Sequence, residues 1–192
     1  MDEKERWNAR YAAQPPVQVA TPNPFLRQHL AQMPRGQVLD LAMGEGHNAI
    51  FLAQRGFSVT GIDISEIAVE RAQQLAKYLG VVVHTQVADL RATKLPENMY
   101  DAIVCFYYLD RELFPQIITT LKPGGVLMYE TYTREQAQYG HPTNPAYLLE
   151  PNELLEAFRA FRIRLYRDLV LEGPTAVASL IGEKLGDGCC LV

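Results

Sequence analysis

Cysteine and tryptophan are scarce in this chain of 192 residues, and basic residues are not in excess. It contains three cysteines, one tryptophan and 18 Lys and Arg residues against 22 Asp and Glu residues, for a net charge of −4. Three cysteines at this spacing match neither a disulfide framework nor a zinc motif. The acidic balance argues against a nucleic-acid backbone as the main partner, because phosphate affinity comes largely from clustered Lys and Arg. We therefore expect no metal, no nucleic acid and a small-molecule partner.

Long hydrophobic runs are absent as well. No apolar stretch approaches the roughly 20 residues that a bilayer requires, and the N-terminal sequence MDEKERWNAR is charged where a signal peptide would be apolar. We therefore expect a cytoplasmic protein without a membrane partner, whose oligomeric state is open. A hydrophobic content of 48% is typical of a globular domain. We expect one domain over residues 1–192, with cap helices over 1–33, a core over 36–182 and a frayed tail over 183–192.

Strand-like and helix-like segments alternate regularly from residue 36 onward. Strands are expected at 37–42, 57–63, 81–89, 100–106, 126–132, 161–168 and 175–182. Helices are expected at 2–13, 25–32, 48–55, 66–79, 113–121 and 152–159. Strands that alternate with helices of this length indicate a parallel sheet with helices on both faces. The last two strands are joined by the short turn LEGP, so we expect them to pair antiparallel.

A glycine turn connects the first core strand to its helix, in the sequence VLDLAMGEGHNAIFLA at residues 38–53. In an open α/β sheet, ligands bind outside the carboxyl ends of the strands. Gly44 and Gly46 let the backbone approach such a ligand closely, and the N–H groups that open the helix near Asn48 can meet an anionic group. Ala42 stands where a dinucleotide-binding turn has its first glycine. We expect the extra methyl group to be tolerated if φ is negative there.

Three acidic residues help to choose between a dinucleotide and S-adenosylmethionine as the ligand of this turn. Asp63 ends the second core strand, where its carboxylate can accept both ribose hydroxyls of either ligand. Asp40 lies just before the glycines, where it would repel a pyrophosphate but could meet an ammonium or sulfonium group through a water molecule. Asp89 could accept a hydrogen bond from an adenine amino group, with Ile64 and Leu90 as apolar walls. Together with the antiparallel final strands, these residues favour S-adenosylmethionine.

Taken in order, the sequences VLDLAMGEGHNAIFLAQRGFSVTGIDIS, VADL, YDAIVCF and LKPGGVLMYE resemble successive motifs of the Rossmann-like (class I) S-adenosylmethionine-dependent methyltransferases. The resemblance covers about residues 36–182, and the sequences GHNAIFLAQRG and YLDRELFP are most similar to the tellurite-resistance-type branch. It implies a three-layer αβα fold whose seven-stranded sheet has the order 3-2-1-4-5-7-6, with the last strand antiparallel. It also implies a set of cofactor-binding residues: Asp40, Ala42, Gly44, Gly46, Asn48, Asp63, Ile64, Asp89, Leu90 and Cys105.

The expected activity is methyl transfer from S-adenosylmethionine to a small acceptor, such as a thiol or a metalloid oxyanion. The cofactor supplies the reactive centre, so the protein has to align the acceptor, exclude water and, for some acceptors, provide a base. No residue of the sequence stands out as that base. The candidate acceptor-binding residues are Tyr11, Tyr108, Tyr132, Arg134 and His141. Two alternatives stay open at this point: a nicotinamide-dependent oxidoreductase, and a cofactor-binding regulatory protein without turnover.

Overall fold

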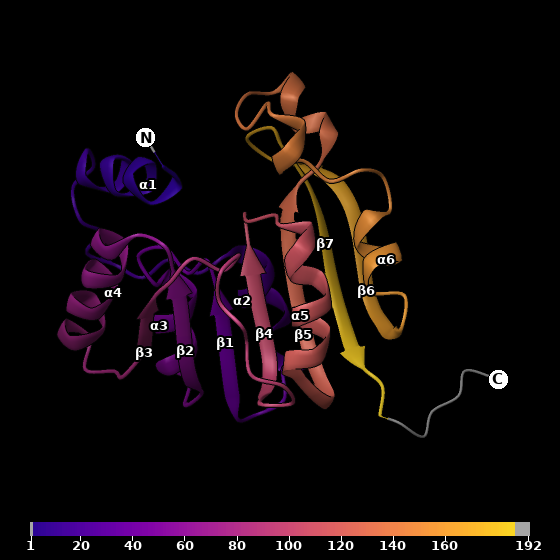
Figure 1. Cartoon of the computed structure of the whole chain (residues 1–192), viewed down its shortest axis with the longest axis horizontal. Helices are drawn as coiled ribbons and strands as arrows, with labels where there is room; N and C mark the ends of the chain where they lie inside the picture. The colour runs from indigo at the N-terminus through magenta and orange to yellow at the C-terminus, as the bar shows by residue number, and fades with distance from the viewer. Residues whose placement is uncertain (1, 187–192) are drawn as a thin grey trace. The chain divides into compact units, whose positions relative to one another are not determined.

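The computed structural model of the protein describes residues 2–186 (Figure 1). Seven strands form one sheet in the order β3-β2-β1-β4-β5-β7-β6, in which β7 pairs antiparallel with both β5 and β6. This order and the antiparallel seventh strand confirm the predicted Rossmann-like fold. The strands are β1 (Gln37–Leu41), β2 (Ser58–Asp63), β3 (His84–Val87), β4 (Tyr100–Phe106), β5 (Leu121–Tyr132), β6 (Phe161–Leu171) and β7 (Thr175–Lys184).

The chain divides into two compact units, of which the first ends at Lys94. In this unit β2 pairs parallel with β1 on one side and with β3 on the other. Every residue of β1 after the first is buried, which is typical of a strand inside a parallel sheet. The helices of the unit are α1 (Glu3–Ala12), α2 (Pro24–His29), η1 (Leu30–Gln32), α3 (His47–Ala53) and α4 (Glu66–Tyr78).

Helix α4 shows how local sequence determines the first unit. Ser65 begins the helix, because its hydroxyl oxygen accepts a hydrogen bond from the Ala68 N–H at 3.2 Å. The apolar face of α4 is buried at helical spacing and contacts β2, β3 and α3. The loop residues Val81 and Val83 pack on the core cluster that contains Leu75. The strand predicted at 81–89 is therefore shorter than expected, because its first residues pack beside α4 instead of pairing with β2.

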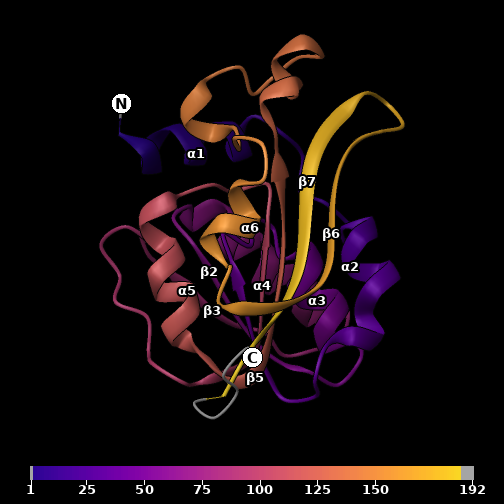
Figure 2. The same ribbon diagram turned by 90° about the vertical axis from the view of Figure 1, so that its right-hand side faces the viewer.

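The second unit begins at Leu95 and contains β4 to β7. Figure 2 shows the long hairpin of β6 and β7, with α5 and α6 together on one face of this unit's strands. An aromatic cluster joins these helices to the sheet, with neighbouring ring centroids 5.3–6.2 Å apart. Its members are Phe114, Tyr129, Phe158 and Phe161. The helices of the unit are η2 (Arg111–Leu113), α5 (Phe114–Thr120), η3 (Arg134–Gln138), η4 (Pro145–Tyr147) and α6 (Glu153–Ala157).

Several boundaries in the second unit differ from the sequence prediction, and strand β6 runs three residues further than predicted, to Leu171. Strand β5 begins at Leu121, five residues earlier than expected, and its register against β4 shifts near Tyr100. Strand β7 continues to Lys184, which pairs with Phe161, so residues 183 and 184 belong to the sheet and not to the predicted tail. The rest of that tail from residue 187, including Cys189 and Cys190, lies outside the described residues. The prediction of a single domain stays a prediction.

Candidate active site

The turn between β1 and α3 has a left-handed backbone at three positions. The φ angles are 53° at Ala42, 57° at Gly44 and 77° at Gly46. Two backbone hydrogen bonds hold the turn, from the Met43 N–H to the Ile62 carbonyl and from the Gly46 N–H to the Met43 carbonyl. A negative φ at Ala42, the condition under which the extra methyl group is expected to be tolerated, is therefore not met, because the turn has a left-handed residue at that position.

The turn also packs closely on its surroundings. A Cβ atom at Gly46 would lie 2.9 Å from the Ala72 Cβ on α4, and one at Gly61 would lie 2.1 Å from the Met43 Sδ. Met43 is buried in a small cluster with Val69 and Ala72. The glycines thus allow the close contact between turn, β2 and α4 that places the turn at the carboxyl end of β1.

Asp63 ties the glycine turn to the end of β2. Its Oδ2 accepts a hydrogen bond from the Gly44 N–H at 2.8 Å, and its Oδ1 accepts one from the Ser65 N–H at 2.9 Å. Burial raises the pKa of the Asp63 carboxyl, while the backbone donors, Ser65 first, act in the opposite direction. Each carboxylate oxygen can accept a second hydrogen bond, so Asp63 can brace the turn and still accept ligand hydroxyls.

Asp40 is an almost completely buried carboxyl group just before the turn. It is 1% exposed, and its Oδ2 has no hydrogen-bond partner among the described residues. The Ala49 N–H donates a hydrogen bond to the carboxyl group. Burial raises the pKa of Asp40 to about 8, and the neighbouring charge of Asp63 acts in the same direction. A partnerless carboxylate oxygen in this position is a candidate for contact with a cationic ligand group.

Tyr11 on α1 lies against the same turn. Its hydroxyl oxygen is 2.8 Å from the position that a Cβ atom at Gly44 would occupy. Burial raises the pKa of the Tyr11 hydroxyl well above its ordinary value, and the negative charges of Asp63 and Glu45 add to this effect. The sequence suggests Tyr11 as an acceptor-binding residue, whereas the structure places it with the cofactor candidates of the first unit.

Several polar contacts hold α1 against α4. The Ser65 hydroxyl donates to the Asn8 Oδ1 at 2.7 Å, so Ser65 caps α4 and binds α1 at once. Arg71 donates to the Gln14 carbonyl at 2.9 Å and forms a largely buried ion pair with Glu45 at 3.1 Å. These contacts position α1 beside the glycine turn.

The other predicted cofactor residues of the first unit are Asn48, at the start of α3, and three residues near the end of β2: Ile64, Asp89 and Leu90. The Asn48 Oδ1 accepts a hydrogen bond from the Asn23 N–H at 2.8 Å, so this side chain holds the segment before α2. Leu90 is buried and Ile64 is half-buried, and the Ala88 N–H donates to the Asp63 carbonyl at 2.9 Å, which brings the 88–90 turn beside the end of β2. Asp89 is exposed and accepts from the Arg91 N–H at 2.9 Å.

The second unit places two tyrosines at the carboxyl ends of β4 and β5. Tyr107 has a left-handed backbone, with φ at 57°, and is 44% exposed. Its ring lies on that of Tyr132, with centroids 5.0 Å apart and planes at 31°. Sequence reasoning selects Tyr108, because an alternating strand predicts that one of the two neighbouring tyrosines points inward but cannot say which. Tyr107 itself has the left-handed backbone that turns its side chain outward, and the pattern of apolar and polar residues does not predict that conformation.

Tyr108 and Cys105 contact the buried interior of the second unit, in contrast to the exposed Tyr107. The Tyr108 carbonyl accepts a hydrogen bond from the buried Tyr129 hydroxyl at 2.7 Å. Cys105 is fully buried within the second unit, and its Sγ lies 3.9 Å from the same carbonyl. Burial raises the pKa of the Tyr129 hydroxyl strongly, and Cys105 adds to this effect. These contacts fix the backbone that presents Tyr107.

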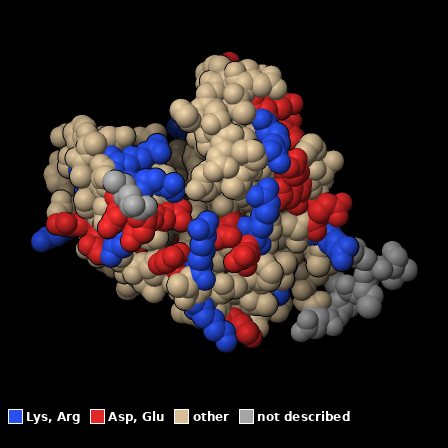
Figure 3. Space-filling view, turned by 45° about the horizontal axis from the view of Figure 1, so that its top comes forward, with Lys and Arg blue, Asp and Glu red and all other residues tan. Residues whose placement is uncertain are grey.

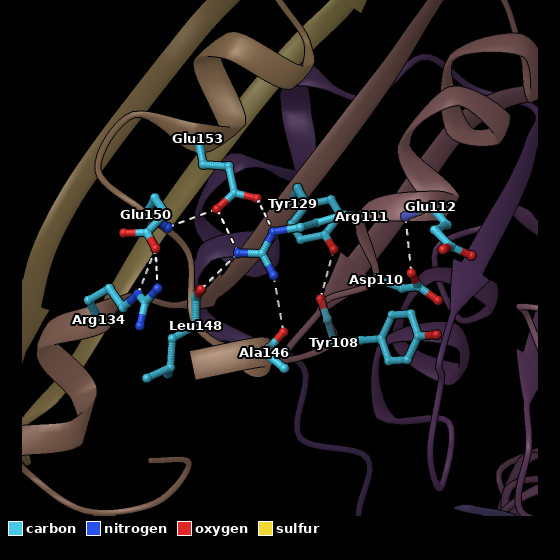
Figure 4. A network of polar contacts seen from close by, with 10 residues as sticks. All are labelled: Tyr108, Asp110, Arg111, Glu112, Tyr129, Arg134, Ala146, Leu148, Glu150 and Glu153. Atoms are coloured by element: carbon cyan, nitrogen blue, oxygen red, sulfur yellow. Dashed lines mark hydrogen bonds and ion pairs between the residues drawn. The ribbon is translucent and has the colours of Figure 1, made fainter. Parts of the chain in front are cut away.

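Arg111 holds the segment that follows β5 (Figure 4). Its guanidinium binds both carboxylate oxygens of Glu153, at 2.6 and 2.8 Å, and donates to the carbonyls of Ala146 and Leu148. The same Glu153 accepts from the Glu150 N–H at 2.8 Å. One arginine from η2 thereby fixes the end of the segment that leads into α6.

Arg134 and His141 lie in the exposed part of this segment. The Arg134 Nε donates to Glu150 at 2.9 Å, as Figure 4 also shows. His141 is exposed, and its carbonyl accepts a hydrogen bond from the Gln136 side chain at 3.2 Å. The structure thus brings Arg134 to the base of the segment that Arg111 holds, and places His141 nearer its middle.

The fold and the comparison with known proteins agree on the kind of domain that the chain resembles. Residues 38–125 match the family model described as a methyltransferase domain. This match and the strand order confirm the predicted resemblance to the Rossmann-like methyltransferases. The matched residues include the glycine turn, Asp63 and the 88–90 turn.

Similar proteins include methyltransferases with different acceptors. The ubiquinone biosynthesis O-methyltransferase of Pseudomonas fluorescens is 32% identical over 110 residues, which cover 54% of this chain and 47% of the relative. TehB of Haemophilus influenzae is 34% identical over 89 residues, 45% of this chain and 31% of TehB. The TehB crystal structure superposes with a TM-score of 0.75 at 19% identity, over 94% of this chain and 66% of that one.

A more distant neighbour was solved with S-adenosyl-L-homocysteine. The geranyl diphosphate C-methyltransferase of Streptomyces coelicolor superposes with a TM-score of 0.68 at 18% identity, over 84% of this chain and 77% of that one. Likeness at this identity shows the fold alone. The chain spans about half the length of the curated relatives it matches, 43% of one and 52% of another. Among the described residues, none of the helices has the length and apolarity needed to cross a membrane.

Proposed function

We propose that this chain is an S-adenosylmethionine-dependent methyltransferase that acts on a small molecule. The observation that carries the proposal is the partnerless, buried carboxylate oxygen of Asp40 beside a left-handed glycine turn. A cationic ligand group would compensate a negative charge on this oxygen, whereas a pyrophosphate offers no positive charge to compensate it. The family match over residues 38–125 supports the same cofactor.

The residues of the first unit fit this cofactor. When bound, S-adenosylmethionine supplies a methyl group on a positively charged sulfur: a nucleophile would bond to the methyl carbon, and the sulfur would leave as a neutral thioether. Asp63 would hold the ribose hydroxyls, and Asp40 would hold the ammonium group of the amino-acid end. Ile64, Leu90 and Asp89 would hold the adenine ring, and the Tyr11 side chain would exclude water from the glycine turn.

The acceptor is proposed to bind at the carboxyl ends of β4 and β5, where ligands of parallel α/β sheets are held. The stacked rings of Tyr107 and Tyr132 offer an aromatic surface there, and Arg134 and His141 lie in the segment that follows β5. On the face that Figure 3 shows, basic and acidic side chains are interspersed rather than separated. This arrangement supports a small-molecule acceptor rather than a nucleic acid, which requires a basic surface.

The proposed acceptor is a nucleophile that needs no protein base, such as a thiolate or an oxyanion. Glu130 is a buried carboxylate of β5, but Arg167 donates to it at 2.9 Å and the Ser179 hydroxyl at 2.6 Å. These contacts join β5, β6 and β7, so the Glu130 carboxylate is engaged in holding the three strands together.

Calorimetric titration with S-adenosylhomocysteine tests the cofactor. We expect the wild-type chain to bind it and the Asp63→Asn variant to bind at least about tenfold more weakly, since a lost charged hydrogen bond costs about 1.5–3 kcal/mol. Glu172→Gln in the exposed turn between β6 and β7 is the matched control and should bind as the wild type does. Circular dichroism should show that both variants are folded. Absence of wild-type binding at high ligand concentration would contradict the proposal.

Two further measurements separate the alternatives. Titration with NAD and NADP should give no binding, and tight binding of either would favour an oxidoreductase. Incubation with labelled S-adenosylmethionine and a metabolite extract, followed by mass spectrometry, should reveal a methylated small molecule. Tight cofactor binding without any methylated product would instead favour a regulatory protein.

A further inference from the structure

The buried carboxyl group of Asp40 has little to stabilise a negative charge. Its Oδ2 has no partner within residues 2–186, and the one donor identified for the carboxyl group is the Ala49 N–H. The side chain is 1% exposed, so water does not replace the missing partners. A carboxylate with so few donors is unfavourable, and a buried acid in this environment keeps its proton.

The charged and titratable groups around the turn do not stabilise the negatively charged form of Asp40. Asp63 on β2 contributes a like charge to Asp40. Glu45 in the turn forms an ion pair with Arg71 of α4, so the Arg71 guanidinium compensates the charge of Glu45 and not that of Asp40. Tyr11 of α1 is a neutral phenol, because burial raises the pKa of its hydroxyl. Burial lowers the pKa of His47, the first residue of α3, which favours its neutral form.

We propose that Asp40 is neutral in the ligand-free chain and releases its proton to solvent when a ligand with an ammonium group binds at the glycine turn. The inference rests on the proposed function, since the amino-acid end of the cofactor carries that ammonium group. Binding exchanges a proton on Asp40 for the ligand's cation, so the carboxylate forms only when a positive charge compensates it. Asp40 is then a specificity-determining residue, which selects ligands that carry an ammonium group.

Proton release can be measured directly. S-adenosylhomocysteine is titrated at pH 7 in phosphate and in Tris, and the dependence of the observed enthalpy on the buffer gives the protons released. With the pKa of Asp40 at about 8, we expect about 0.9 of a proton per ligand bound. The dissociation constant should fall about tenfold for each pH unit between about 6 and 7.5, because the bound state requires the deprotonated acid.

Two controls isolate the group that releases the proton. The ligand 5′-methylthioadenosine lacks the amino-acid end and should bind without proton release. The Asp40→Asn variant cannot ionise and should bind S-adenosylhomocysteine more weakly, without proton release and without the pH dependence.

The outcomes distinguish this inference from the proposed function. Binding of S-adenosylhomocysteine to the wild type without proton release would overturn the inference alone, as would equal release by Asp40→Asn or with 5′-methylthioadenosine. Failure of the wild type to bind S-adenosylhomocysteine at any pH from 6 to 9 would overturn both.

Discussion

Ala42 adopts a left-handed backbone conformation that residues other than Gly, Asn and Asp rarely take. Its φ of 53° brings the Cβ close to the following carbonyl oxygen, at a cost of about 1–2 kcal/mol. Glycine avoids this contact but loses more conformational freedom on folding, about 0.5–1 kcal/mol relative to alanine. The turn therefore retains its geometry with an alanine, at a modest cost in stability.

The Ala42→Gly variant should be more stable than the wild type, because the relief of strain exceeds the added entropy loss. We expect an increase of about 0.5–1 kcal/mol in the free energy of unfolding, measured by urea denaturation with an unchanged m-value. The matched control is Ala53→Gly at the end of α3, which should lose about 0.5–1 kcal/mol. Equal destabilisation by the two substitutions would show that Ala42 is unstrained.

At the scale of elements, one arginine connects η2, η4 and α6. Arg111 binds Glu153 with two hydrogen bonds and satisfies two carbonyl groups of the chain that leads into α6. The segment that contains Arg134 and His141 is thus held at its carboxyl end by a side chain that enters from the β4 side. Exposed ion pairs contribute little, but a bidentate arginine that also binds backbone carbonyls orders a segment.

The Arg111→Gln variant should loosen this segment without unfolding the sheet. We expect hydrogen exchange in residues 145–150 to accelerate about tenfold, with a loss of only about 1 kcal/mol in global stability. Arg134→Gln removes an exposed pair with Glu150 and is the matched control, with little expected effect on exchange in the same residues. If both variants exchange alike, Arg111 does not order the segment.

At the scale of the whole molecule, buried carboxyl groups link stability to pH. The pKa of Asp40 rises from 3.8 to about 8, so folding favours its protonated form. The stability that this preference contributes is fully present below about pH 4 and is lost progressively as the pH rises to about 8. Burial raises the pKa of Asp63 as well, which acts in the same direction.

The Asp40→Asn variant removes the larger of these two effects. Relative to the wild type, its free energy of unfolding should improve steadily from pH 4 to pH 8, by an amount on the order of a few kcal/mol. Urea denaturation at several pH values measures the difference between the two proteins, and Glu172→Gln should show no such trend. A constant difference between Asp40→Asn and the wild type across this range would mean that Asp40 is ionised throughout.

The succession of strands and helices along the chain follows from local sequence patterns, which do not depend on how the elements pack. Apolar runs such as VLDLA must be buried on both sides, and Ser65 and the glycines after the helices mark where helices begin and end. These features are enough to predict an alternating α/β chain with an antiparallel end. The strand order 3-2-1-4-5-7-6 came from the family resemblance, because periodicity does not determine which strands become neighbours.

Contacts between distant residues decided the details of the site. The sign of φ at Ala42 depends on hydrogen bonds from the turn to β2, and the burial that keeps Asp40 protonated depends on the packing of whole elements. The outward direction of Tyr107 rather than Tyr108 depends on the Tyr129 hydroxyl, 21 positions further along the chain. Strand alternation and motif spacing describe neighbours in sequence, whereas strain, desolvation and exposure arise from groups that only folding brings together.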